Sequence, residues 1–322
     1  MAAAAQGSSP RIVLLAGGLG GARLAPPLSR EIGSGRLSVV ANVGDDLDWL
    51  GLRVCPDLDS IAYALAGLWH GDRGWGRRDE TFNVRDGLER LGAPTWFAVG
   101  DHDLALHLER TRLLRSGSSL TEASAELARR LGTRGGVTLL PASDLPSPTR
   151  LRLCDGRTLT FQEWYVREHA VPEVEETLLA GGSASPAVRS ALAAADAVIF
   201  APSNPLTSIG TILALDGMAS AIRSVPIRIA VSPVVLGKAS TSASIAHHSR
   251  ARQRVLRAAG GKDRPSSIAA RYRDFVEAFV IDAADGSEAD EIRRLGLRVE
   301  PADVLDDGAL ARVLGRLAAL SS

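Results

Sequence analysis

The distribution of apolar and polar residues along the chain predicts short buried strands that alternate with helices. Apolar-rich segments typical of buried strands are followed, in most cases, by apolar residues at helical spacing. The segments lie at 11–16, 36–43, 195–201, 226–232, 275–282 and 295–303, and a last helix is expected from Asp307. Such alternation favours a parallel sheet covered on both faces. We therefore expect an α/β protein with a Rossmann-like, three-layer parallel sheet.

The middle of the chain breaks this rhythm. From about Gly71 it becomes charged and rich in Gly and Trp, and helices are predicted over 103–117 and 119–132, the second with a capping box from Ser119 to Glu122. Alternating residues around Asp155–Gly156 predict a β-hairpin. We expect a mixed helical and β-hairpin insertion over 71–189 that binds substrate. The core would comprise 11–70 and 190–322, with a disordered tail over 1–10 and a partly helical segment over 240–266.

Composition excludes several classes of protein. The chain has 322 residues, 37 basic and 37 acidic, so its net charge of +0 lacks the basic footprint of a nucleic-acid-binding protein. No apolar run reaches the length of a membrane span, and the first ten residues lack the features of a signal peptide. We expect a cytoplasmic protein without a membrane or nucleic-acid partner. Two cysteines provide neither a disulfide framework nor a zinc site.

The first predicted strand runs into a loop with two glycine pairs, Gly17–Gly18 and Gly20–Gly21. Glycine permits close approach of a ligand, and the N-terminus of the following helix favours an anion, so this loop is a candidate phosphate cradle. The alternative is a tight strand-to-helix turn without a ligand. Arg23 stands where a dinucleotide fingerprint needs its third glycine, which disfavours a nicotinamide-dependent oxidoreductase.

Two further loops follow predicted strands and carry polar side chains. The second loop holds five aspartates, Asp45, Asp46, Asp48, Asp57 and Asp59. Carboxylates beside a phosphate loop favour Mg²⁺, whereas single aspartates also serve as turn formers and helix caps, with Asp59 or Ser60 placed to cap a helix. The third loop, 201–210, offers hydroxyls and an amide for phosphate or a base edge, or simply caps a helix. Asp103 and His107 have the i,i+4 spacing more typical of a surface ion pair.

Taken together, the motifs resemble the 2-phospho-L-lactate transferase family, which acts in the biosynthesis of the deazaflavin coenzyme F-420. The resemblance covers about 11–317 and rests on motifs in one order: AGGLGGARL, NVGDD, PDLDS, RGWGRRDETF, GDHDLALHL, LLPASD, FQEWYVR, APSNPLTSIGTIL and SPVVLGKA. It implies a Mg²⁺-dependent transferase that moves a phosphorylated three-carbon acid from a guanosine-diphosphate-activated donor to the ribityl hydroxyl of the deazaflavin Fo. GMP is then released, and a homodimer is expected.

The resemblance also implies roles for individual residues. Catalysis and Mg²⁺ binding fall to Asp45, Asp57 and Asp59. Nucleotide binding falls to Gly17, Gly18, Gly20, Gly21, Ser203, Asn204, Pro205, Ser208 and Gly210. Acceptor binding falls to Asp59, Thr81, Gly100, Asp101 and His107, and the motifs RGWGRRDETF and GDHDLALHL of the insertion would help to enclose the flat acceptor.

Departures from the family pattern concern the donor, which can be a lactyl-, enolpyruvyl- or glyceryl-type acid. After Lys238 the usual basic residue and glycine are replaced by a segment with Ser240, Thr241, Ser242 and Ser244. These hydroxyls would suit a phosphoglycerate donor, or the segment is a linker without donor contact. His102 also replaces the usual arginine. A different class remains open as an alternative: a non-catalytic, nucleotide-sugar-binding regulator of the gluconeogenesis-factor type, which shares the glycine-rich start.

Overall fold

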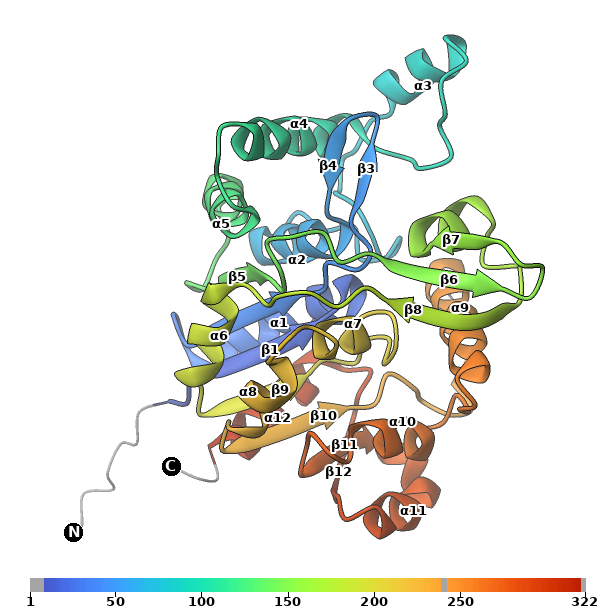
Figure 1. Ribbon diagram of the computed structural model, residues 1–322. Helices are drawn as coiled ribbons and strands as arrows, with labels where there is room; N and C mark the ends of the chain where they lie inside the picture. Colours follow the sequence, from blue (N-terminus) through green and yellow to red (C-terminus); the bar gives the residue numbers. More distant parts are fainter. Residues whose placement is uncertain (1–8, 239–241, 320–322) are drawn as a thin grey trace.

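The computed structural model describes residues 9–238 and 242–319, and within them a seven-stranded parallel sheet forms the centre of the molecule (Figure 1). The predicted tail over 1–10 and the residues 239–241 lie almost wholly outside the described part. In spatial order the strands are β5 (Thr138–Pro141), β2 (Leu37–Ala41), β1 (Ile12–Ala16), β9 (Ala197–Phe200), β10 (Ile227–Val231), β11 (Ala278–Asp282) and β12 (Arg298–Ala302). Every neighbouring pair is parallel. The predicted α/β class is confirmed.

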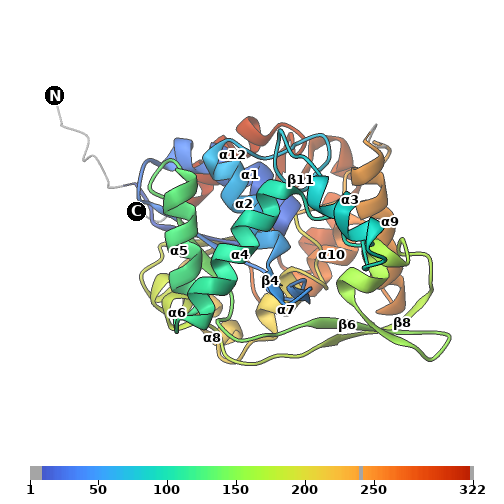
Figure 2. The same ribbon diagram turned by 90° about the horizontal axis from the view of Figure 1, so that it is seen from above.

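Helices cover both faces of this sheet, as Figures 1 and 2 show together. On one face α1 (Gly18–Ile32) packs against α2 (Pro56–Ala66) and α12 (Asp307–Ala318). On the other lie α6 (Pro186–Ala193), α7 (Ile209–Leu213) and α8 (Met218–Arg223), and α10 (Pro265–Tyr272) and α11 (Ala289–Arg294) lie toward the β12 edge. Apart from the edge strand β12, whose residues are mostly exposed or half-buried, the strands between these layers are almost continuously apolar because both of their faces are buried.

Helix α1 runs through Pro26 and Pro27 without a break. Proline removes one backbone donor and normally breaks a helix interior. Here Leu24, Ala25 and Leu28 are fully buried against the neighbouring layers. Packing of this apolar stripe therefore outweighs the lost backbone hydrogen bonds, and the helix stays continuous.

A second group of elements lies outside the central sheet and extends from α5 (Leu120–Leu131), which packs on β5 and α2, to an antiparallel sheet. It contains the hairpin β3 (Leu47–Trp49) and β4 (Leu52–Val54), and the helices α3 (Asn83–Arg90), α4 (Asp101–Arg115) and α5. It also contains an antiparallel sheet of β7 (Thr158–Thr160), β6 (Thr149–Leu153) and β8 (Val174–Leu179), against which α9 (Ala243–Ala258) packs. The predicted hairpin at Asp155–Gly156, the two helices and the capping box at Ser119 are confirmed.

Strand β5 lies within the range 71–189 expected for the insertion, yet it pairs with β2 at the edge of the central sheet. The chain thus returns to the core sheet between α5 and β6, because Leu139 and Leu140 are buried against the apolar core. A division at 71 and 189 does not describe this return. The insertion consists of two excursions, one on either side of β5.

The strand order places a topological switch between β1 and β9. The chain proceeds from β1 toward β2 and β5 on one side, then crosses to β9 on the other. In doubly wound sheets, ligands bind in the crevice outside the carboxyl ends of the strands at this point. Among the described residues, no helix combines the length and apolar character that crossing a bilayer requires.

Candidate functional site

The three loops singled out by the sequence meet at the switch point. The Gly17 N–H donates a hydrogen bond of 2.9 Å to Ser203 Oγ, which joins the loop after β1 to the loop after β9. Asn42, at the end of β2, donates from Nδ2 to Asp57 Oδ2 at 2.9 Å and to the Thr207 carbonyl at 3.3 Å. The carboxyl ends of adjacent parallel strands therefore bring these polar groups into one network.

The four glycines of the first loop make room for neighbouring protein atoms. A Cβ at Gly17 would lie 2.5 Å from Ser208 Oγ, and one at Gly18 would lie 2.6 Å from Asp57 Oδ1. At Gly20 a Cβ would collide with Ser203 Oγ, and at Gly21 it would meet Ile61. None of the four has a positive φ. Close approach of α1 to α2 and to the β9 loop, rather than backbone freedom, explains this run of glycines.

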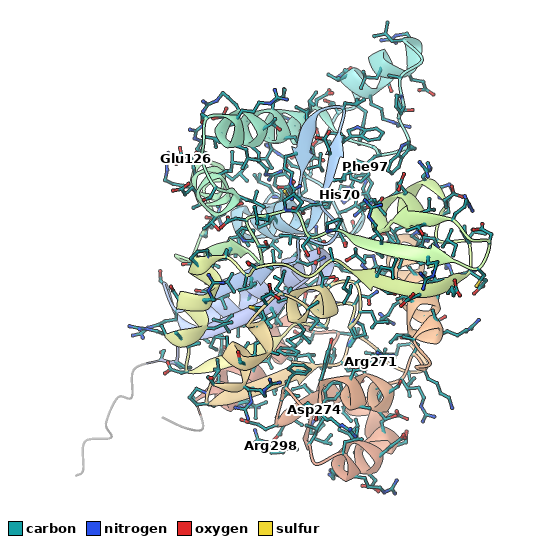
Figure 3. All side chains as sticks on the ribbon, in the orientation of Figure 1. His70, Phe97, Glu126, Arg271, Asp274 and Arg298 are labelled. Atoms are coloured by element: carbon teal, nitrogen blue, oxygen red, sulfur yellow. The ribbon has the colours of Figure 1, made fainter. Side chains whose placement is uncertain are left out.

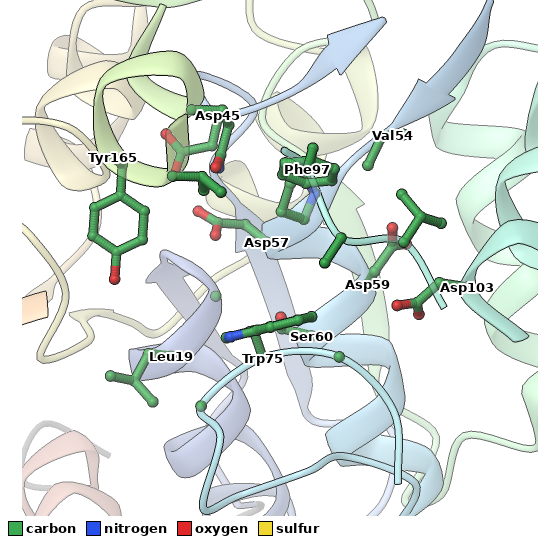
Figure 4. Close-up of a pocket in the computed structure, with 18 of the residues that line it drawn as sticks. Leu19, Asp45, Val54, Asp57, Asp59, Ser60, Trp75, Phe97, Asp103 and Tyr165 are labelled. Carbon is green, nitrogen blue, oxygen red and sulfur yellow. The ribbon is translucent and has the colours of Figure 1, made fainter. Parts of the chain in front are cut away.

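Two cavities of similar size open on either side of this loop. One, of about 430 Å³, is largely aromatic, and Figure 4 shows many of its residues. The other, of about 420 Å³, is lined by the glycine loop, the β9 loop and residues after β10. Among the described residues the two share seven that line both: Gly18, Leu19, Asp45, Asp57, Phe161, Tyr165 and His248. A molecule in one cavity therefore borders a molecule in the other at this shared wall.

Two buried carboxylates, Asp45 and Asp57, stand at the junction of the cavities. Burial raises the pKa of Asp57 to about 6, and burial together with the charge of Asp57 raises the pKa of Asp45 well above its ordinary value. Asp45 Oδ1 is buried and has no hydrogen-bond partner among the described residues. An ionised pair in this setting needs a cation or a proton to stabilise it.

The junction fits Mg²⁺ held by two carboxylates. Among residues 9–238 and 242–319, no three His, Cys, Asp or Glu side chains are arranged to hold a metal ion by themselves. Magnesium, however, is commonly bound through one or two carboxylates together with substrate phosphates. The unpartnered Asp45 Oδ1 and the neighbouring Asp57 match that donor set.

The other three aspartates of the predicted cluster are engaged elsewhere. Asp59 accepts from both terminal nitrogens of the buried Arg110, at 3.1 Å from Nη1 to Oδ2 and through a short contact from Nη2 to Oδ1. Asp46 pairs with Arg53 at 2.8 Å, and the exposed Asp48 accepts from the Gly51 N–H. Asp59 is thus less available to a cation than Asp45 and Asp57, and its metal role stays a prediction.

Asp59 is not a helix cap either. Helix α2 begins after Cys55, and no side chain caps its N-terminus. The predicted cap at Asp59 or Ser60 is therefore wrong, because Pro56 in the first turn moves the start of the helix upstream of both residues. Asp57 instead accepts from the Gly18 backbone, which ties the first turn of α2 to the glycine loop.

Aromatic rings from distant parts of the chain line the aromatic cavity: Tyr63, Trp75, Trp96, Phe97, Phe161 and Tyr165. Phe161 and Tyr165 are stacked, with ring centroids 5.3 Å apart and an interplanar angle of 10°. Trp49 packs edge-on behind Trp96 at 4.9 Å. These surfaces suit a flat conjugated ring. Trp75 lies in RGWGRRDETF, a motif expected near the acceptor, whereas the other five rings were not predicted to belong to the site.

The pair Asp103 and His107 also lines this cavity and is buried, which corrects the expectation of a surface ion pair. Tyr63 Oη donates to Asp103 Oδ1 at 2.7 Å, while His107 Nδ1 lies 3.6 Å from Asp59 Oδ2. Burial raises the pKa of Asp103 to about 6 and lowers that of His107 to about 4. The two residues point to different partners because α4 packs this face against α2 and β4.

Only two of the five residues predicted to bind the acceptor, Asp59 and His107, line the aromatic cavity. Thr81, Gly100 and Asp101 lie outside it. Asp101 accepts hydrogen bonds from Thr81 Oγ1 at 2.6 Å and from the Val84 N–H at 3.0 Å, which hold its pKa well below the usual range. These three residues fix the connection between α3 and α4 rather than contact the cavity.

The glycine-loop cavity contains most of the residues predicted to bind nucleotide. Gly17, Gly18, Gly20, Ser203, Asn204 and Ser208 line it, whereas Gly21, Pro205 and Gly210 do not. Asn204 Oδ1 accepts from the backbone of Leu206 and Thr207, so this side chain also shapes the loop. Thr207, one of the hydroxyls of the predicted loop 201–210, lines the cavity as well. Ser232, Lys238 and Arg252 also line it and were not among the residues predicted from the sequence.

The hydroxyl residues of the segment after Lys238 do not lie together in one site. Ser240 and Thr241 lie outside the described residues. Ser242 caps α9 and contacts the Asp72 carbonyl, and Ser244 lines the aromatic cavity. Its proposed influence on the donor therefore rests on residues that the structure does not describe or does not place in the glycine-loop cavity.

Fold and site together define a doubly wound α/β protein with two ligand cavities joined at a carboxylate pair. The family model described as 2-phospho-L-lactate transferase CofD matches residues 12–304. A phosphoenolpyruvate transferase of Kitasatospora aureofaciens is 36% identical over 323 residues, covering 97% of this chain and 98% of that protein. One from Streptomyces griseus is 37% identical over 298 residues, covering 89% and 90%. The chain belongs to the 2-phospho-L-lactate transferase CofD family.

A solved structure shares the fold at much lower sequence identity. The crystal structure of a UPF0052-family protein from Bacillus halodurans has a TM-score of 0.58 and 14% identity, and the match covers 94% of this chain and 97% of that one. This similarity supports the architecture and carries no conclusion on ligands.

Proposed function

We propose that this transferase moves a phosphorylated three-carbon acid from a guanosine-diphosphate-activated donor to the ribityl hydroxyl of Fo in the biosynthesis of coenzyme F-420. The observation that carries the proposal is the junction itself. Two cavities of about 430 and 420 Å³ share a wall that contains Asp45 and Asp57. A donor in one and an acceptor in the other would meet at these carboxylates, in agreement with the family.

The glycine-loop cavity suits the donor diphosphate. It lies at the N-terminus of α1, whose first turn has neither an acidic residue nor a side-chain cap. Free N–H groups and the positive end of the helix dipole favour an anion there. Ser203, Thr207 and Ser208 add hydroxyls, and Lys238 adds a positive charge.

The aromatic cavity suits the acceptor. Stacked and edge-on rings around it favour a planar tricycle, and its opening toward Asp45 and Asp57 would let a ribityl chain reach the junction. In this arrangement the ribityl hydroxyl would approach the donor phosphorus from the side opposite the leaving GMP, as an in-line displacement requires.

The reaction forms one bond between the ribityl oxygen and the phosphorus that carries the acid, and breaks the bond from that phosphorus to GMP. The hydroxyl proton is released to solvent, and Asp45 Oδ1, which has no hydrogen-bond partner among the described residues, would face the cation. Asp57 is oriented by Asn42 and the Gly18 backbone and helps to hold the reacting groups. When bound at Asp45 and Asp57, Mg²⁺ would neutralise charge on the diphosphate. Positioning at the junction supplies much of the remaining rate enhancement.

The proposal is tested by incubating the protein with Fo, Mg²⁺ and each guanylylated donor, namely the phospholactate, phosphoenolpyruvate and phosphoglycerate derivatives. Mass spectrometry should detect a charged deazaflavin and GMP in equal amounts. A single reaction that contains all three donors would rank them by the amount of each product. A predominant phosphoglyceryl product would support a role for the serine segment after Lys238. Absence of product with every donor would refute the proposal. Binding of a UDP-sugar without binding of Fo would favour the regulator instead.

A further inference from the structure

Helix α9 places an imidazole on the wall that the two cavities share. His248 is half-buried and borders both cavities, whereas its neighbour His247 borders only the aromatic one. His248 Nδ1 lies 2.7 Å from Tyr165 Oη, and the two rings meet edge-on with centroids 5.4 Å apart. The pair thus connects α9 to the turn that follows the β6–β7 hairpin.

The hydrogen-bond direction in this pair follows from the inventory of partners. Burial raises the pKa of Tyr165, so its phenol stays protonated, and burial lowers the pKa of His248 to about 4, so its imidazole is neutral at pH 7. Among the described residues, His248 Nδ1 is the one hydrogen-bond partner of the Tyr165 hydroxyl. A largely buried hydroxyl donates where it can. Tyr165 therefore donates to Nδ1, and the His248 proton resides on Nε2.

The Nε2–H group of His248 forms no hydrogen bond within the part of the chain that the structure describes. Apart from backbone groups of Gly18 and Leu19, the shared wall otherwise carries two carboxylates, a phenol already engaged with Nδ1, and the Phe161 ring. His248 Nε2 is therefore the side-chain N–H of the junction that is left for a ligand.

We infer that His248 Nε2–H recognises the carboxylate of the transferred three-carbon acid, which makes His248 a specificity-determining residue. The inference rests on the proposed function. The acid is attached to the phosphorus that is attacked, so it must lie at the junction, where His248 borders both cavities. A carboxylate beside Asp45 and Asp57 meets like charges and needs a directed donor. Tyr165 fixes the tautomer and the orientation of that donor.

Two isosteric variants separate the roles of the two nitrogens. His248→Asn keeps an amide near the Nδ1 position as a partner for Tyr165 and removes the distal N–H. His248→Gln places an amide N–H near the Nε2 position. The matched control is Gln253→Ala, an exposed position on the same helix that lines neither cavity.

The measurement is equilibrium binding in the absence of Fo. The ligands are guanylylated phosphoenolpyruvate, GDP, and the ethyl ester of GDP at the terminal phosphate, which lacks a carboxylate. We expect the wild type to prefer the carboxylated ligand over the ethyl ester. His248→Asn should weaken binding of the carboxylated ligand about ten- to a hundredfold, as expected for a lost hydrogen bond to a charged group, and leave GDP and the ethyl ester unchanged. His248→Gln should retain much of the preference, and Gln253→Ala all of it.

Each outcome decides the inference. A His248→Asn variant that melts like the wild type and keeps the full preference for the carboxylated ligand over the ethyl ester would overturn the inference. In that case, product formation with Fo by the wild type would still support the proposed function. Equal affinity of the wild type for guanylylated phosphoenolpyruvate and for the ethyl ester would also overturn the inference. If the wild type binds none of the guanosine ligands, both the inference and the proposed function fail.

Discussion

Asp59 and Arg110 form a bidentate ion pair that is buried beside the aromatic cavity, 51 residues apart in the sequence. Arg110 also donates to the Arg53 carbonyl and lies 3.3 Å from His107 Nδ1. The pair therefore links α2, α4 and β4. We expect its loss to lower the free energy of unfolding more than it affects turnover.

Replacing Asp59 by Asn is expected to destabilise the protein. The variant leaves Arg110 buried without its counter-charge, which typically costs about 3–5 kcal/mol in the free energy of unfolding. Urea denaturation measures this change. The double variant Asp59→Asn/Arg110→Gln should recover part of the loss, since it removes the unpaired charge. Unchanged stability with abolished turnover would support the predicted metal role of Asp59.

Replacing Asp57 by Asn is expected to have the opposite profile. The pKa of Asp57 is raised to about 6 because the ionised form is poorly solvated, and a neutral amide avoids that cost. We expect turnover to be lost while the melting temperature is kept or raised. A variant that melts early and keeps its turnover number would show that Asp57 is structural.

The sequence predicted the part of the site that follows from strand periodicity. Loops after β1, β2 and β9 must meet once the sheet is parallel, and Gly17, Asp57 and Ser203 do so. It did not predict which aspartates remain available, because Arg53 and Arg110 neutralise Asp46 and Asp59 through contacts that no local pattern signals.

Most of the aromatic cavity was equally unpredictable from the sequence, although the motif that contains Trp75 was expected near the acceptor. Trp75, Phe97 and Tyr165 come from separate loops without shared periodicity, so only tertiary packing shows that they face one cavity. Thr81 and Asp101 illustrate the reverse case. They sit in motifs typical of the family, yet their hydrogen bonds are to each other and to α3.

A pair of helical glycines should respond oppositely to alanine. Gly20→Ala places a Cβ against Ser203 Oγ and 3.0 Å from the Pro202 carbonyl oxygen, which would push the β9 loop away from α1. Gly87→Ala in α3 meets no atom within 4 Å, and alanine is favoured in a helix by about 1 kcal/mol. We expect Gly20→Ala to lower the melting temperature and weaken GDP binding, and Gly87→Ala to raise stability. Equal effects of the two changes would contradict the close packing of the glycine loop.

Asp103 should make stability depend on pH. Its pKa rises from 3.8 unfolded to about 6 folded, so the folded state binds the proton more tightly. The stabilisation that the folded protein gains from this tighter proton binding is fully present below pH 4 and is lost as pH rises through 6. The loss amounts to about 3 kcal/mol in the free energy of unfolding. Asp103→Asn keeps an oxygen acceptor for Tyr63 Oη and removes the ionisation.

Thermal unfolding of Asp103→Asn between pH 4 and 8 checks this sign. The variant should melt above the wild type at pH 8 and match it at pH 4. Asp274→Asn serves as the control, because Asp274 is exposed at the far side of the core from the cavities (Figure 3). A variant that is less stable than the wild type at pH 8 would contradict the burial cost.

Trp75 is expected to determine affinity for the flat acceptor. Its ring extends along one side of the aromatic cavity near Leu19 and Ser60 (Figure 4), and the Arg73 guanidinium lies 5.1 Å from its centroid on the loop. Stacking of a planar heterocycle on one aromatic side chain is typically worth about 1–3 kcal/mol by alanine substitution. Trp75→Ala should therefore weaken binding of Fo roughly 5- to 150-fold in a fluorescence titration.

GDP affinity should stay unchanged, because Trp75 does not line the glycine-loop cavity. Leu91→Ala, at an 83% exposed position beyond α3, is the matched control and should leave both affinities as they are. An unchanged dissociation constant for Fo in Trp75→Ala would show that the acceptor binds elsewhere.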